Sequence, residues 1–162
     1  NLFALSQVGP LLEREIGSAR FFSVYTITLV TAVLAYPILF PSAGIVVVGA
    51  SGALFGLIGF GMSYCHRSGI AMRGYRNFFL KWSIYGFLFG MALPGVANMA
   101  HAGGLMGGVI LGIFIEWDMR DRTRFRRGWQ GGAFACLLLT LAAFTCWLYA
   151  RVGEVAANPG GF

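Results

Sequence analysis

Charged residues are scarce in this sequence: Asp, Glu, Lys and Arg make up 11% of its 162 positions, where soluble domains carry about a quarter. Hydrophobic residues make up 57%, and the mean hydropathy is +0.72. Several uncharged runs approach the roughly 20 residues needed to span a bilayer. The composition therefore argues against a soluble protein with a very apolar core and favours a membrane protein.

Proline and cysteine are also rare, with five prolines and three cysteines. The 24 glycines follow no Gly-X-Y period, which excludes a collagen-like chain. None of Cys65, Cys136 and Cys146 belongs to a CxxC pair, and each lies in or beside an apolar run. We interpret them as small apolar side chains rather than disulfide partners or metal ligands. The sequence predicts no metal and no cofactor.

Apolar runs separated by charged or Gly/Pro-containing turns predict an all-α, polytopic transmembrane helical bundle. The first run continues a helix that we expect to begin before Asn1. A basic loop is expected at 118–128, an additional membrane helix within 129–150, and a flexible tail at 151–162. The predicted membrane spans are 1–12, 21–40, 51–65, 78–93, 98–117 (or from 101) and 131–150.

Basic residues fall almost entirely on one side of this predicted topology. Eleven of the 12 lie between spans one and two, three and four, or five and six, if Lys81 near the start of the fourth span is included. Because basic loops stay in the cytoplasm, we expect a multi-pass protein of a bacterial inner membrane with these three loops inside. Topology then accounts for the net charge of +6. Contact of the run 120–127 with anionic lipid is favoured over nucleic-acid binding, and no nucleic-acid partner is predicted.

A serine and a histidine are expected at the same depth in the membrane. Ser51 begins the third span and His101 lies at the start of the fifth, and both spans run inward from the outer side. At 1.5 Å per residue, each residue lies about 25 Å from the cytoplasmic end of its helix. Ser51 is then either a helix cap or a nucleophile that His101 activates as general base. No buried Asp or Glu is expected in any span, because Glu116 lies at the cytoplasmic end of the fifth. The sequence therefore supports a dyad at most.

Glycine spacing suggests how these two helices come together. Small residues every fourth position let membrane helices pack closely. Such packing would bring the hydroxyl and the imidazole within hydrogen-bonding distance, although glycine stripes also pack helices in polytopic proteins of any function. The stripes are Gly52, Gly56 and Gly59 in the third span and Gly104, Gly108 and Gly112 in the fifth.

Three motifs carry a family resemblance over residues 1–117. Gly49-Ala50-Ser51-Gly52, followed by Phe55, resembles the GxSG motif of the rhomboid intramembrane serine proteases. The stretch 97–104, with Gly108 four residues on, resembles that family's AHxxG-type motif. Asn1, with a Glu and a Gly downstream in 13–18, resembles the end of the family's HxxxN pattern. The three motifs occur in the family's order and with the expected topology.

The resemblance implies a rhomboid-like catalytic core at 1–117 that cleaves transmembrane segments of other membrane proteins. It makes Ser51 the nucleophile and His101 the general base. Asn1 and the Ser51 backbone N–H would be the hydrogen-bond donors to the oxyanion. Substrate would enter near 78–93. The family's first helix, its following loop and the HxxxN histidine are expected before Asn1, giving seven helices in all. The implied site-shaping residues are Gly49, Gly52, Phe55, Gly104 and Gly108.

Two other functions stay open at this point. A non-catalytic rhomboid-like protein would bind transmembrane clients without cleaving them, although this chain keeps both the Ser and the His. A transporter or channel would place polar or charged residues at mid-depth, and few occur there. Asn98 is interpreted as the N-cap of the fifth helix, with a polar residue lining the site as the alternative.

Overall fold

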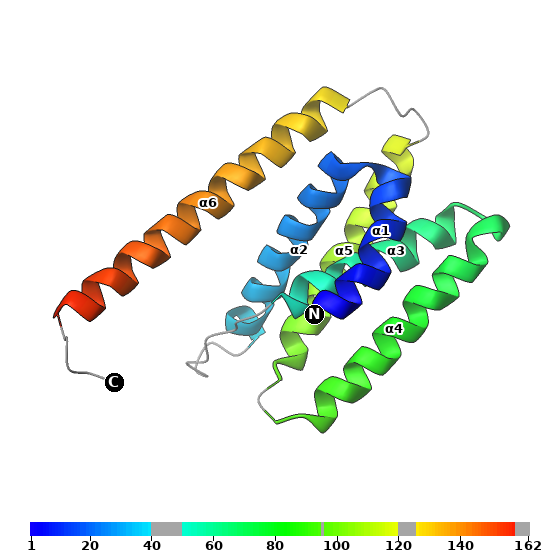
Figure 1. Ribbon diagram of the computed structural model, residues 1–162. Coiled ribbons are helices and arrows are strands. Elements are labelled where there is room, and N and C mark those ends of the chain that lie inside the picture. The colour runs from blue at the N-terminus through cyan, green and yellow to red at the C-terminus, as the bar shows by residue number, and fades with distance from the viewer. Residues whose placement is uncertain (40–49, 95, 120–125, 158–162) are drawn as a thin grey trace.

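The computed structural model describes residues 1–39, 50–94, 96–119 and 126–157, and these form helices joined by short turns (Figure 1). No strand occurs in these ranges, which confirms the predicted all-α class. The helices are α1 (Leu2–Ile16), α2 (Ser18–Leu39), α3 (Ser51–Arg67), α4 (Arg73–Ala92), α5 (Asn98–Met119) and α6 (Arg126–Ala157), with one 3₁₀ turn at Ile70–Met72.

Several helices extend beyond the spans expected from hydropathy. The charged run Glu13-Arg14-Glu15 lies inside α1, which ends where Gly17 adopts a φ of 81°. The additional helix α6 reaches past the predicted 129–150 at both ends, so 151–157 is helical rather than part of a flexible tail. Glu, Arg and Ala are good helix formers, so the hydrogen-bonded ladder continues after the apolar run has ended.

Helix α3 is the centre of the bundle and contacts α1, α2, α4 and α5. Every residue from Gly52 to Gly61 is buried. Helix α6 lies at the edge of the molecule and packs beside α2 (Figure 1). The site therefore depends on the neighbours of α3, whereas α6 does not approach it.

Glycines allow α5 and α3 to approach at backbone distance. A Cβ atom on Gly104 would collide with the carbonyl oxygen of Gly52, and one on Gly108 would collide with that of Gly56. The predicted contact between the stripes is therefore confirmed on the side of α5, and on the side of α3 it is confirmed for Gly59, whose Cβ would meet the Leu105 carbonyl oxygen. The sequence did not reveal that Gly52 and Gly56 turn their own missing side chains toward α2, where Cβ atoms would meet Ala32 and Thr28.

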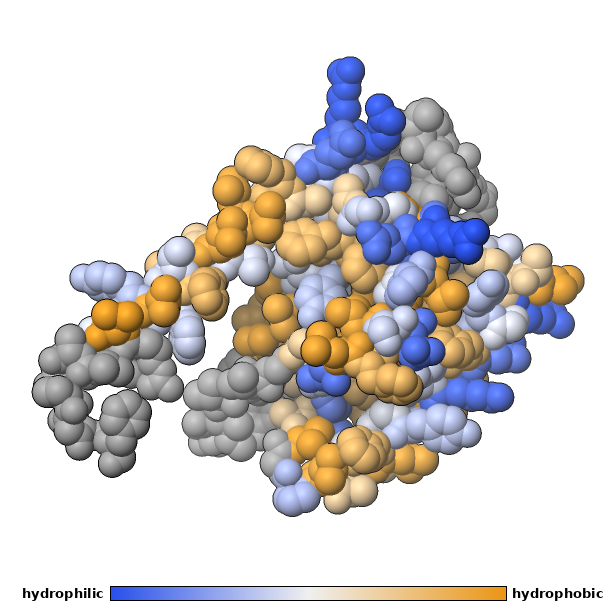
Figure 2. Space-filling view, in the orientation of Figure 1, coloured by the Kyte–Doolittle hydropathy of each residue, from blue (hydrophilic) through white to orange (hydrophobic). Residues whose placement is uncertain are grey.

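Three of the described helices are long and apolar enough to cross a membrane: α2, α5 and α6, over 18–35, 98–115 and 126–150. Helix α3 has 17 residues, or about 25 Å at 1.5 Å per residue, and the membrane crossings of α1, α3 and α4 stay predictions. Figure 2 shows hydrophobic surface along α6, and hydrophilic residues gather where α1 ends and α2 and α6 begin. This distribution is the one expected of helices whose apolar faces meet lipid.

Candidate active site

Ser51 and His101 meet at one end of the bundle. The Ser51 Oγ lies 2.9 Å from the His101 Nε2, and the His101 side chain is only 6% exposed. Ser51 does not cap its helix, because Ala50 holds the N-cap position of α3. The contact expected between these two side chains is thus present, and their role in catalysis stays a prediction.

The backbone packing of α3 on α5 explains this meeting. Ser51 directly precedes Gly52, whose carbonyl oxygen faces Gly104, and His101 lies one turn before Gly104. One of the backbone contacts between the two helices therefore lies within a turn of both Ser51 and His101. Gly49, the other glycine expected to shape the site, lies outside the described residues.

Two aromatic rings hold the imidazole in place. Phe55 lies one turn after Ser51, and its ring stacks on His101 with centroids 4.3 Å apart and an interplanar angle of 15°. Phe87 of α4 packs on Phe55 at 4.7 Å and meets the imidazole edge-on at 6.3 Å. The absence of a side chain at Gly86 leaves room for the Phe55 ring, since a Cβ there would lie 2.7 Å from it.

Phe87 and Gly86 were not singled out from the sequence. The available signal was the pair Gly86 and Gly90, two small residues four apart in an otherwise bulky, aromatic helix. Such a pair marks a face where another group approaches the helix closely. Here the approaching groups are the Phe55 ring at Gly86 and the Asn98 side chain at Gly90.

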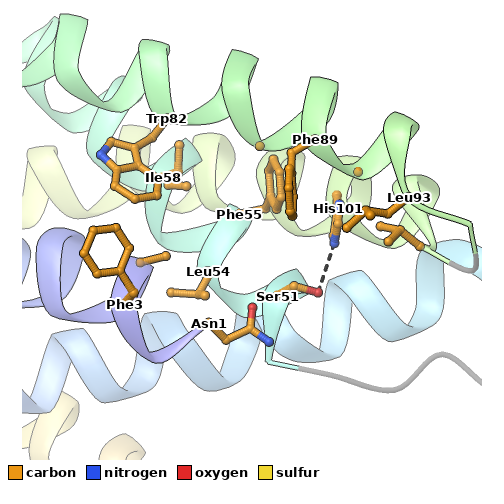
Figure 3. A pocket seen from close by; sticks show the side chains of 14 residues that line it. Asn1, Phe3, Ser51, Leu54, Phe55, Ile58, Trp82, Phe89, Leu93 and His101 are labelled. Carbon is orange, nitrogen blue, oxygen red and sulfur yellow. Dashed lines mark hydrogen bonds between the residues drawn. The ribbon is translucent and has the colours of Figure 1, made fainter.

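The dyad opens into a cavity of about 380 Å³. Polar groups lie at one end, where Asn1, Ser51 and His101 line it, and the remainder is apolar (Figure 3). The Asn1 side chain makes no capping hydrogen bond to α1. A mostly apolar cleft with a few polar groups at one end is typical of a site that binds an apolar ligand in one orientation. Its apolar walls include Phe3, Leu54, Ile58, Trp82, Phe89 and Leu93.

The interpretation of Asn98 as a helix cap is wrong. Its Oδ1 is buried and has no hydrogen-bond partner among the described residues. The N–H groups that a cap would satisfy, those of Ala100 and His101, donate instead to the Ala97 carbonyl at 2.9 and 3.3 Å. The amide points toward Gly90 of α4, at the wall of the cavity. Asn98 therefore fits the alternative of a polar residue beside the site.

No cluster of three or more His, Cys, Asp or Glu side chains suited to a metal ion occurs among the described residues. Cys65, Cys136 and Cys146 are unpaired.

Comparison with known proteins gives the family. The model of the rhomboid domain matches residues 1–117. The chain is similar to "Rhomboid protease GluP" of Bacillus subtilis (36% identity over 112 residues, 67% of this chain and 21% of that protein). It is also similar to "RHOMBOID-like protein 1" of Arabidopsis thaliana (34% over 127 residues, 69% of this chain and 29% of that protein). No solved structure matches the chain.

The chain spans well under half the length of these relatives, and the matched region contains Ser51, His101 and their glycine-lined interface. The family match agrees with the helical fold and with three helices suited to crossing a bilayer. The chain belongs to the rhomboid family and is an integral membrane protein.

Proposed function

We propose that the chain is an intramembrane serine endopeptidase that cleaves transmembrane segments of other membrane proteins with a Ser51/His101 dyad. The observation that carries this proposal is the 2.9 Å contact between Ser51 Oγ and His101 Nε2 at the polar end of an apolar cavity. The similarity to a relative named a rhomboid protease supports it. We further propose a bacterial inner membrane location with the basic loops in the cytoplasm.

In this mechanism His101 first acts as general base. The Ser51 Oγ attacks the carbonyl carbon of the scissile peptide while His101 Nε2 takes the hydroxyl proton. The tetrahedral intermediate then collapses, the C–N bond breaks, and the imidazolium returns the proton to the leaving amine. Water next attacks the acyl-enzyme with the same assistance, releasing the new carboxyl group and restoring the Ser51 hydroxyl.

The oxyanion of this intermediate needs hydrogen-bond donors. Ser51 is the first residue of α3, and N–H groups in the first turn of a helix have no partner within it. The Asn1 side-chain amide lies at the same end of the cavity. Donors aimed at a developing oxyanion are each worth about 10²–10³ in rate in serine proteases, so both groups are assigned to this role.

The shape of the cavity fits a transmembrane substrate. Its apolar walls come from α1, α3 and α4, and the dyad lies at its end rather than its middle. An apolar side chain of the substrate enters the cavity while the peptide bond reaches Ser51. Helix α4 contributes Trp82 and Phe89, and Leu93 follows directly after its end. This is the helix beside which substrate enters.

The test uses the full-length protein in liposomes with a panel of model transmembrane substrates. We expect Ser51→Ala and His101→Ala each to lower the cleavage rate by more than about a hundredfold, because residues that act as a unit lose their joint effect when either is removed. The matched control is Ser68→Ala, which removes a serine hydroxyl at the opposite end of α3. Cleavage that persists in either dyad variant would refute the assignment.

Labelling with a fluorophosphonate probe separates catalysis from binding. Wild-type protein should be labelled at Ser51, Ser68→Ala should react equally, and His101→Ala should react far more slowly. A protein that retains transmembrane substrates but neither cleaves them nor reacts with the probe would instead be a non-catalytic rhomboid protein that binds transmembrane clients.

A further inference from the structure

A second cavity, of about 390 Å³, lies at the opposite end of α3 from the dyad. Its polar end is marked by His66, fifteen residues after Ser51, which is about 22 Å along the helix. Helix α4 packs mainly on α3, so α3 forms the floor between α4 and α5. The lining residues are Met62, Ser63 and His66 of α3, Arg76 and Leu80 of α4, and Val109 of α5.

Polar and apolar groups are separated along this cavity. His66 and Arg76 lie near the ends of their helices, where α3 finishes and α4 begins. Met62 lies one turn further into the bundle than His66, and Leu80 one turn further than Arg76. Val109 extends the apolar wall from the middle of α5. His66 and Arg76 therefore lie nearest the end of the bundle, and the apolar side chains lie further in.

Arg76 lines the cavity and is hydrogen-bonded to its neighbour on the helix. Its side chain is half-buried, and its Nε and Nη2 donate to the Asn77 Oδ1 at 3.3 and 3.0 Å. A guanidinium has five N–H donors, so several remain after these two bonds. His66 lines the same end of the cavity, and Ser63 lines it about one turn further inward, beside Met62. Among the described residues, no carboxylate lines the cavity.

We propose that this cavity binds an anionic phospholipid, with the headgroup phosphate on Arg76, Ser63 and His66 and an acyl chain along Met62, Leu80 and Val109. Arginine and hydroxyl donors suit phosphate oxygens, and a phospholipid presents its phosphate at the membrane surface with its chains inward. The guanidinium of Arg76 adds a positive charge to this lining, which favours a lipid with net negative charge. The proposal is independent of peptidase activity.

Native mass spectrometry of the purified, delipidated full-length protein tests the site. The probes are phosphatidylglycerol and phosphatidylcholine with identical chains. We expect Arg76→Gln to weaken phosphatidylglycerol binding about fivefold, because one arginine near the surface is worth roughly 1 kcal/mol toward anionic lipid. The matched control is Arg73→Gln, which removes the same charge one turn earlier on α4 but does not line the cavity.

A second variant probes the chain-binding part. Leu80→Trp places a larger side chain in the groove and should lower the number of phosphatidylglycerol molecules retained, while the thermal midpoint in detergent reports whether it is folded. Arg76→Lys keeps the charge and should recover part of the affinity. Glycerol phosphate, which lacks acyl chains, should not displace the bound lipid at equal concentration.

Three results would overturn the proposal. If Arg73→Gln and Arg76→Gln weaken phosphatidylglycerol binding equally, surface charge alone would explain the effect. Equal retention of phosphatidylcholine and phosphatidylglycerol by the wild type would remove the selectivity for anionic lipid. Displacement by glycerol phosphate would indicate a site for small phosphates rather than for lipid.

Discussion

Adding a single methyl group at Gly104 tests whether helix packing sets the dyad. In Gly104→Ala the new Cβ would overlap the Gly52 carbonyl oxygen, which is backbone and cannot rotate away. Helices α3 and α5 must then separate by about 1 Å to reach ordinary van der Waals contact. Ser51 precedes Gly52 directly, and His101 lies one turn from Gly104, so the separation acts where the two side chains meet.

The expected loss of Ser51 reactivity in Gly104→Ala follows from the observed geometry. A 1 Å separation takes the Ser51–His101 contact from 2.9 Å to about 3.9 Å, beyond the roughly 3.2 Å limit of a good hydrogen bond. A misplacement of that size can lower an enzyme's rate about 10²-fold. Crowding a packed interface also costs about 1–3 kcal/mol of stability. We therefore expect about a hundredfold slower reaction of Ser51, with a lower thermal midpoint.

The assay is the rate of fluorophosphonate labelling per folded molecule, with the folded fraction taken from thermal melts. The matched control is Gly74→Ala in the first turn of α4, where nothing lies within 4 Å of the added Cβ; it should label at the wild-type rate. If folded Gly104→Ala reacts as fast as Gly74→Ala, the inference that α3–α5 backbone contact fixes the dyad distance is refuted.

Three further substitutions test the neighbouring contacts. Gly52→Ala should destabilise the protein by about 1–3 kcal/mol because its Cβ lies 2.5 Å from that of Ala32; adding Ala32→Gly should restore the thermal midpoint, and failure to do so would contradict this pairing. Phe55→Leu keeps an apolar side chain but removes the ring stacked on His101, so labelling should slow several-fold, as expected from about 0.5–1.5 kcal/mol of ring contact. Gly61→Ala brings a methyl within 2.6 Å of an aromatic ring of α4 and should lower the thermal midpoint while leaving labelling per folded molecule unchanged.

The contact between Ser51 and His101 was predictable because it depends on properties that can be read along the sequence. Charge asymmetry orients the helices, helix rise gives depth, and glycine spacing marks a face that admits a neighbour. These rules place both residues at the same level on adjacent helices. They do not specify the direction of each glycine face, which is why the contacts of Gly52 and Gly56 with α2 emerged only from the structure.

Asn98 and Phe87 show where this reasoning stops. An Asn at the start of a helix is the residue type preferred for a cap, yet the Ala97 carbonyl satisfies the N–H groups that the side chain would have bonded. The backbone thus satisfies the N–H groups at the start of α5, and the Asn98 side-chain amide turns toward α4 instead. Phe87 is one of many aromatic residues in α4, and its contact with Phe55 depends on how α4 is rotated about its own axis.

The two interfaces of α3 differ in a way that suits a site for large substrates. Against α5 the contact is backbone to backbone through Gly104 and Gly108, so no side chain can adopt another rotamer to relieve a shift. Against α4 the contact is made by side chains such as Phe55 and Phe87, which have alternative rotamers. The rigid interface holds Ser51 and His101 at a fixed distance. The adaptable interface borders the cavity, where the proposed function places side chains of a substrate. In that proposal one helix provides both a fixed geometry and an adjustable binding wall.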